Sequence, residues 1–213
     1  MQNSALFSGF TDTDRQKMLK CLGAKIKKCN INETIMSYND NREYVYALLY
    51  GTAELASYDY DGNKSILERY SKDSIFGELF FHSSGTDEIM VTALEECEVL
   101  SFKYNNAISQ CENACNRHKK FLDNFFILLS KKLIAQAQHI EVLSKRTIRE
   151  KLLAYFEIQA KENGSFLFFV PFSLSDLADY LSIDRSAMQR ELRRLNKEGL
   201  LQSKGRKITL IKK

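Results

Sequence analysis

The stretch from residue 185 to residue 190 gathers side chains with several hydrogen-bonding groups: Arg185, Ser186, Gln189 and Arg190. If this stretch is helical, these side chains share the outer face at the start of the helix, because helical neighbours recur at spacings of three and four residues. A guanidinium group can bind O6 and N7 of guanine with two hydrogen bonds, and a glutamine amide can bind N6 and N7 of adenine. We therefore predict that this face reads base edges in the major groove of DNA.

The segments around this face have the pattern of two short helices joined by a tight turn. The first helix is expected over residues 173–181 and the second over residues 185–198, where Gly199 ends it. Residues 182–184 form the turn, and the small Ala178 lies where the helices would cross. This arrangement is typical of a helix-turn-helix, whose second helix enters the major groove.

A basic segment follows the second helix. Residues 204–210 include Lys204, Arg206 and Lys207 and are expected to form a β-hairpin wing. Contacts from such residues to phosphates fix the register of a protein on DNA without reading its sequence. We also count Ser173, at the start of the first helix, among the DNA-contacting residues.

Charge is unevenly distributed along the 213 residues. The chain has 31 Lys+Arg and 27 Asp+Glu, but residues 144–213 alone hold 15 basic and 8 acidic residues. A basic C-terminal part after a slightly acidic body is typical of a nucleic-acid binder with a second module. A solvated basic face would give the same asymmetry, so charge supports the prediction and cannot carry it alone.

A long helix without Gly or Pro is expected over residues 116–143. Apolar residues recur along it at alternating spacings of four and three, with Gln136 filling one position of the pattern. This spacing predicts a coiled-coil seam that joins two copies of the chain, with a polar residue at one seam position. A helix buried against its own domain is the alternative. The seam residues are Leu122, Phe126, Leu129, Leu133, Ile140 and Leu143.

The first half of the chain has a different pattern. A short amphipathic helix is expected over residues 11–27, followed from residue 31 to about residue 102 by short β-like runs broken by turn residues. Strands of this length with frequent turn signals favour an antiparallel barrel or roll over a parallel sheet.

The C-terminal part begins after the long helix. Thr147 and Glu150 have the spacing of a capping box and open a helix expected to reach about Ala160, and a short strand follows over residues 166–170. We expect an α+β fold in three parts: a sensor roll over 1–115, a dimerisation helix over 116–143 and a winged helix-turn-helix over 144–213.

The order of these elements resembles the CRP/FNR family of bacterial transcription regulators. The likeness includes Phe-Gly-Glu-Leu at 76–79 within the roll. Residues 143–152 (LSKRTIREKL) resemble the family's hinge and first DNA-domain helix. Residues 177–181 (LADYL), followed by Arg185 and Arg190, resemble its helix-turn-helix.

The resemblance implies a cyclic-nucleotide-binding-like roll and a homodimer that binds a pseudo-palindromic operator and contacts RNA polymerase. By position it also implies that the base-reading residues are Arg185, Ser186, Gln189 and Arg190.

The same resemblance directs attention to an effector pocket. Family members that bind cyclic nucleotides have Gly-Glu-Leu, present here as Gly77, Glu78 and Leu79, and an Arg about ten residues later that neutralises the phosphate. No Lys or Arg occurs between Lys72 and Lys103, and this window holds seven acidic residues. Carboxylates close to a phosphate without a cation repel it. The adenine-facing positions of the long helix align near Gln136, which also departs from the pattern. We therefore do not expect cyclic AMP as an effector, and whether another small molecule acts as one stays open.

The five cysteines show no C-x-x-C spacing, and the tight N-terminal cluster of an FNR-type iron–sulfur protein is missing. Free thiols are expected, because reduced cysteines are the rule inside cells. Cys111 and Cys115 lie four residues apart, on one face if that segment is helical. A thiol or metal redox sensor stays open as the input of the regulator, but no metal ligands are assigned.

Several other classes of protein are poor fits. The longest strictly apolar run has five residues, the N-terminus lacks a secretory signal pattern, and enzyme motifs such as a P-loop or G-x-S-x-G do not occur. We expect a cytoplasmic protein without membrane contact and without catalytic residues. The alternative function is a redox- or small-ligand-sensing module whose helix-turn-helix makes protein contacts.

Overall fold

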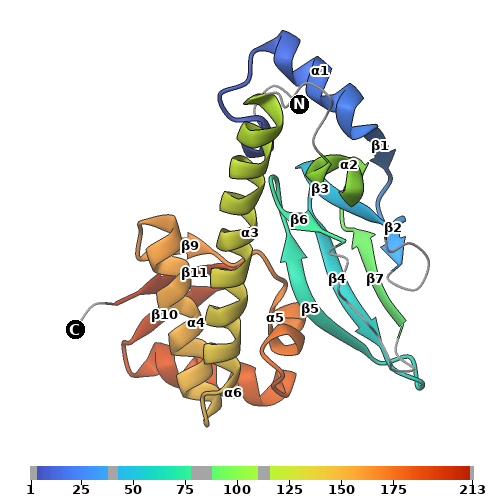
Figure 1. Ribbon diagram of the computed structural model, residues 1–213. Coiled ribbons are helices and arrows are strands. Elements are labelled where there is room, and N and C mark those ends of the chain that lie inside the picture. Colours follow the sequence, from blue (N-terminus) through green and yellow to red (C-terminus); the bar gives the residue numbers. More distant parts are fainter. Residues whose placement is uncertain (1–3, 38–42, 78–87, 110–115, 212–213) are drawn as a thin grey trace. The chain divides into compact units, whose positions relative to one another are not determined.

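The computed structural model describes residues 4–37, 43–77, 88–109 and 116–211 (Figure 1). The chain divides into two compact units, residues 1–133 and 134–213, and the long helix α3 (Asn116–Leu143) contributes to both. The functional boundaries expected at 115/116 and 143/144 stay predictions.

The first unit begins with short helices. A 3-10 turn (η1, Ala5–Phe7) precedes α1 (Asp12–Leu22), whose first turn is capped by the Thr11 hydroxyl. The prediction that this helix continues to residue 27 is wrong. Gly23 adopts a left-handed conformation with φ of 58° and ends α1, and the next residues form β1 (Lys25–Cys29).

Two antiparallel four-stranded sheets form the roll. In the first, the order is β1, β8 (Cys97–Lys103), β3 (Tyr44–Tyr50) and β6 (Ile75–Phe76). In the second, the order is β2 (Thr34–Ser37), β7 (Glu88–Ala93), β4 (Ala53–Tyr58) and β5 (Lys64–Tyr70). Helix α2 (Tyr104–Ile108) follows β8 and was not expected from the sequence.

The described residues of the first unit include two clusters of buried apolar side chains. In one, Phe121 and Leu128 of α3 join Leu100 and Phe102 of β8. The Phe102 and Phe121 rings meet edge to face at 5.5 Å between centroids. The other cluster includes Phe76, which stacks on Tyr70 at 4.9 Å. The first part of α3 is therefore held to the roll by aromatic packing.

The second unit is built on helices and a small sheet. After the last part of α3, helix α4 (Ile148–Asn163) opens with the predicted capping box between Thr147 and Glu150. The other helices are α5 (Leu174–Tyr180) and α6 (Arg185–Lys197). The three-stranded sheet has the order β10 (Leu201–Lys204), β11 (Lys207–Leu210), β9 (Leu167–Phe169). The predicted α+β class, with a roll, a long helix and a helix-turn-helix, is confirmed. No helix among the described residues is long and apolar enough to cross a bilayer.

Gly51 and Gly62 provide a matched test of packing in the roll. Both have a positive φ, 90° and 79°. A Cβ at position 51 would lie 2.5 Å from the Glu96 backbone oxygen and 2.7 Å from Cys97 Sγ, whereas one at 62 meets no atom within 4 Å. We expect Gly51→Ala to lower the free energy of unfolding by about 2–4 kcal/mol, and Gly62→Ala by about 1 kcal/mol. Urea unfolding measures both values, and equal losses would contradict the close packing at Gly51.

Candidate nucleic-acid interface

The turn between α5 and α6 is fixed by backbone and side-chain hydrogen bonds. Ser182 adopts a positive φ of 52°, and the Ile183 amide donates to the Ala178 carbonyl at 3.0 Å. Asp184 caps α6, because its Oδ1 accepts from the Ala187 amide at 2.8 Å. The start of α6 therefore has a defined direction relative to α5.

A chain of hydrogen bonds connects the cap to the exposed face of α6. The Ser186 hydroxyl donates to Asp184 Oδ1 at 2.6 Å, and Arg190 Nη1 donates to Ser186 Oγ at 3.1 Å. The hydrogen bond from Ser186 is the largest cause of a lowered pKa at Asp184, followed by that from the Ala187 amide. Asp184 therefore stays ionised near neutral pH and attracts Arg190 along the helix.

The predicted base-reading residues all lie in the first two turns of α6. Arg185, Ser186 and Arg190 are exposed and Gln189 is half-buried. The buried residues of α6 are Met188, Leu192 and Leu195. Ser173 is exposed and caps α5, where its hydroxyl oxygen accepts from the Asp176 amide at 3.1 Å.

The wing is a hairpin that starts earlier than predicted. Its first strand begins at Leu201, and Lys204 and Lys207 are cross-strand partners next to the turn. Both lysines are exposed. Arg206 is exposed as well, but its Nε donates to the Val170 carbonyl at 3.0 Å. Arg206 thus anchors the wing to the residue after β9, which the sequence did not indicate.

Two polar connections hold α6 in place, and the sequence revealed neither. The Asn196 amide group donates to Ser203 Oγ at 2.6 Å, and its oxygen accepts from the Ser203 amide at 2.9 Å. Arg149 of α4 forms a bidentate ion pair with Glu198, and its Nη1 lies 3.4 Å from Glu191 Oε1. Both connections lie at the C-terminal half of α6 and leave its N-terminal face open.

The last part of α3 contacts the helix-turn-helix through one pair of rings. The His139 and Tyr180 rings stack at 3.8 Å between centroids, with their planes 6° apart. His139 Nε2 lies 2.9 Å from the Tyr180 backbone oxygen, which can only accept, so the imidazole donates. Burial lowers the pKa of His139, since a charged ring loses hydration there.

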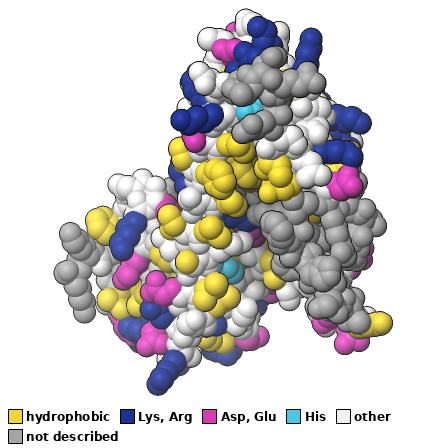
Figure 2. Space-filling view, in the orientation of Figure 1, with side chains coloured by type: hydrophobic (Ala, Val, Ile, Leu, Met, Phe, Trp, Pro, Cys, Tyr) yellow, Lys and Arg dark blue, Asp and Glu magenta, His cyan; other side chains and the backbone are white. Residues whose placement is uncertain are grey.

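The predicted seam residues of α3 differ in exposure within the single chain. Phe126, Leu133 and Ile140 are 60%, 58% and 64% exposed, and the other three seam residues are half-buried. Ile127 and Ile134 add to this exposed apolar surface. Figure 2 shows hydrophobic side chains gathered along α3. The buried face of the helix instead carries Phe121, Leu128 and Val142.

The predicted effector residues are only partly described. Glu78 and Leu79 lie outside the described residues, and Gln136 is exposed. Gly77 has a φ of 82°, and a Cβ there would lie 2.7 Å from the Tyr44 backbone oxygen. Close packing of the turn after β6 therefore requires a glycine at position 77, and this requirement is structural.

The roll also contains paired charges that the sequence did not indicate. Glu54 is 3% exposed and pairs with Lys64 and with Arg69, the latter at 3.3 Å. Lys132 of α3 lies 3.4 Å from Glu68 and donates to the Ile75 carbonyl at 3.1 Å. Its ammonium group also lies 5.2 Å from the Tyr70 ring centroid. These cations reach the roll from β5 and α3, outside the cation-free window at 73–102.

Family models match both parts of the chain. A cyclic nucleotide-binding domain matches residues 26–114, and a Crp-like helix-turn-helix domain matches residues 150–213. The two matches together cover more than two thirds of the chain and occur in the order that the roll and the winged helix-turn-helix require. The chain belongs to the CRP/FNR family of transcription regulators. The CRP/FNR assignment makes it a regulator with a helix-turn-helix DNA-binding domain, and not an enzyme.

Solved structures of CRP/FNR regulators have the same fold. FixK2 from Bradyrhizobium japonicum is 20% identical, with a TM-score of 0.65 over 89% of this chain and 93% of that one. CLP from Xanthomonas campestris, described as a c-di-GMP responsive global regulator, is 16% identical, with a TM-score of 0.68 over 95% and 100%. A CooA mutant from Carboxydothermus hydrogenoformans is 16% identical, with a TM-score of 0.67 over 98% and 95%. A comparison with curated protein sequences gives no match.

The contact between His139 and Tyr180 predicts a pH dependence of stability in this CRP/FNR chain. The pKa of His139 is lower in the folded chain than in the unfolded chain. At a pH between these two pKa values, the unfolded chain therefore binds more protons than the folded chain. The contribution of His139 is therefore intact above an ordinary histidine pKa of about 6.5 and is lost as the pH falls below it. We expect urea unfolding between pH 7 and pH 5 to show a smaller loss of stability for His139→Gln than for the natural chain. Parallel curves would contradict the burial of a neutral imidazole.

Proposed function

We propose that the protein is a sequence-specific transcription regulator that acts as a homodimer on a pseudo-palindromic operator. The observation that carries this proposal is the exposed N-terminal face of α6, with Arg185, Ser186, Gln189 and Arg190 above a buried apolar face. Major-groove readers of this class contact base edges with the N-terminal residues of the second helix. Lys204, Arg206 and Lys207 of the wing, with Ser173, would bind phosphates and fix the register.

The dimer would form along α3. The seam residues Phe126, Leu133 and Ile140 are more than half exposed in a single chain, although the same helix buries a different apolar face in its own unit. A second copy of α3, packed knobs into holes, would remove these side chains from water. Two copies of α6 would then face half-sites about one helical turn of DNA, ~34 Å, apart.

Cyclic AMP is not the proposed effector. The window 73–102 offers no Lys or Arg to a cyclic phosphate. Two described cations of the first unit already face carboxylates, because Arg69 pairs with Glu54 and Lys132 with Glu68. The effector that we propose is an unidentified small molecule that binds in the roll.

RNA polymerase is the proposed protein partner, as for other regulators of this family. Because the operator and the polymerase lie in the bacterial cytoplasm, we place the protein there.

Arg190 tests direct base reading. A binding selection with purified protein on a random DNA library should enrich a two-fold-symmetric motif, which then serves as the cognate site. Arg190→Ala should weaken binding to that site by about 1–3 kcal/mol and relax the preference at one base pair in each half-site. Fluorescence anisotropy on cognate and scrambled DNA measures both effects.

Lys204→Ala is the matched control for Arg190→Ala. Because it removes an ammonium group that would bind phosphate, it should weaken binding to all sequences alike and reduce the slope of log affinity against log salt by about 1. An equal loss on cognate and scrambled DNA for Arg190→Ala would show that Arg190 touches only phosphate. Binding without salt dependence would instead favour a helix-turn-helix that contacts protein.

Leu133 and Ile140 test the dimer. Lysine keeps the helix propensity of these positions but places a charge on the proposed seam. We expect the double variant Leu133→Lys, Ile140→Lys to sediment as a monomer where the natural chain sediments as a dimer. Tyr60→Lys, at a residue 86% exposed in the turn after β4, is the control and should stay dimeric. A dimer that survives both lysines would place the interface elsewhere.

A further inference from the structure

Two cysteines far apart in the sequence are direct partners in the antiparallel ladder of β1 and β8. Cys29 is the last residue of β1 and Cys97 the first of β8, and their Cα positions pair in the register. Residues directly opposite each other in such a ladder point to the same face of the sheet. Both side chains belong to one core cluster and are 2% and 3% exposed. The fold therefore brings two thiols together that no sequence spacing indicates.

The ladder supplies the backbone geometry that a disulfide requires. Opposed residues of antiparallel strands have Cα atoms about 4.5 or 5.5 Å apart, depending on the type of pair. Disulfides occur over Cα separations of about 4.4–6.8 Å. Joining Cys29 and Cys97 therefore needs side-chain rotation and no displacement of a strand.

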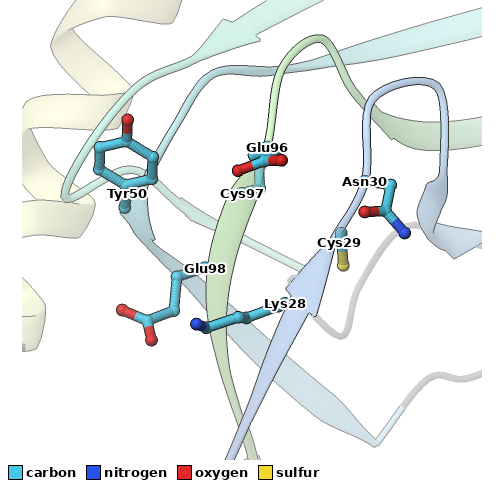
Figure 3. Close-up of a pocket in the computed structure, with 7 residues that line it drawn as sticks. All are labelled: Lys28, Cys29, Asn30, Tyr50, Glu96, Cys97 and Glu98. Carbon is cyan, nitrogen blue, oxygen red and sulfur yellow. The ribbon is translucent and has the colours of Figure 1, made fainter.

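A surface pocket lies beside this pair. It has a volume of about 360 Å³ and is lined by both cysteines together with Asn30, Tyr50 and Glu96. Figure 3 shows Cys29 and Cys97 on neighbouring strands at this pocket. An oxidant as small as a peroxide fits into such a volume.

The groups around the two thiols keep them protonated. Cys97 Sγ lies 3.2 Å from the Thr52 backbone oxygen and 3.3 Å from that of Glu95, and it donates its hydrogen there. Burial raises the pKa of the Cys97 thiol, and Cys29 raises it further; burial is also the main cause of the raised pKa at Cys29. Both groups are therefore protonated at neutral pH and react only when an oxidant reaches them.

We propose that Cys29 and Cys97 form a redox modification site, at which a small hydroperoxide converts the two thiols into a cross-strand disulfide. One thiol sulfur attacks an oxygen of hydrogen peroxide, the O–O bond breaks, and the leaving hydroxide takes up the thiol proton, which gives a sulfenic acid and one water. The second thiol attacks the sulfenic sulfur, the S–S bond forms, and the hydroxyl leaves with the thiol proton as a second water. Two electrons pass from the sulfurs to the peroxide.

The disulfide would tie an edge strand of the roll covalently to its neighbour. β1 lies at the end of its sheet, and among the described strands it pairs only with β8. A covalent bond at their last register pair would prevent this strand from fraying and would close a long loop of the chain. The chain-entropy model assigns such long loops the larger stabilisation.

The test uses a variant in which Cys21, Cys111 and Cys115 are replaced by serine, so that Cys29 and Cys97 remain. After treatment with hydrogen peroxide, the protein is unfolded in a maleimide reagent and weighed by mass spectrometry. We expect it to lose the mass of two hydrogen atoms, to bind no maleimide and to yield one crosslinked peptide that dithiothreitol separates. The oxidised form should melt about 5 °C higher than the reduced form.

Cys29→Ser in the same background is the matched control. Cys97 should then bind maleimide or gain oxygen, and peroxide should not raise the melting temperature. Peptide mapping of the natural chain gives the same readout if the triple variant does not fold. The exposed Cys21 of the natural chain shows that the peroxide was active. Two maleimide-labelled cysteines after peroxide has oxidised Cys21, or a bridge from Cys29 or Cys97 to another cysteine, would overturn the proposal.

Discussion

Helix α3 has two apolar faces, and burial of both is favourable. How each face is buried decides how the rest of the molecule is assembled. Phe121 and Leu128 pack into the roll with the aromatic and aliphatic residues of β8, so the first part of the helix belongs to that unit. Leu133 and Ile140 remain more than half exposed. Fully burying one leucine or isoleucine is worth about 1.5–3 kcal/mol, so a row of exposed ones is a strong reason for self-association. One helix thus holds the roll by one face and, in the proposed dimer, would pack against a second copy by the other.

Helix α6 is fixed by side-chain contacts near its C-terminus, whereas its N-terminal face remains exposed. Arg149 and Ser203 bind Glu198 and Asn196 near its C-terminus. At its N-terminus, the Ser186 hydroxyl donates a hydrogen bond to Asp184, and the Arg190 guanidinium donates one to Ser186. Side chains that are already oriented lose less conformational entropy on binding, which raises affinity without adding contacts. The face that would meet DNA is therefore organised before DNA arrives, while its charged groups remain exposed to solvent.

Local signals made much of the second unit predictable from the sequence. Thr147 and Glu150 indicated the start of α4, and Gly199 marked the end of the recognition helix. The first unit was harder where local signals conflict: Ile26 continues a helical pattern, but the left-handed Gly23 ends α1 before it. β1 was missed because three of its five residues are lysines, which hide the alternation of a strand. Long-range pairs such as Arg149 with Glu198 have no sequence signature, since only the tertiary fold brings them together.

The paired charges of the roll limit which ligands could recruit them at low cost. An isolated buried carboxylate costs several kcal/mol, and removing one partner of a buried pair is more damaging than the pair itself is favourable. Glu54 is almost wholly buried and depends on Arg69 and Lys64. An anionic effector that recruited Arg69 would weaken the ion pair between Arg69 and Glu54. The cost of leaving the Glu54 carboxylate less well paired would reduce the net binding free energy of the effector. A cyclic phosphate that recruited Arg69 would therefore compete with Glu54, and an effector that leaves Glu54 and Glu68 paired would avoid this cost.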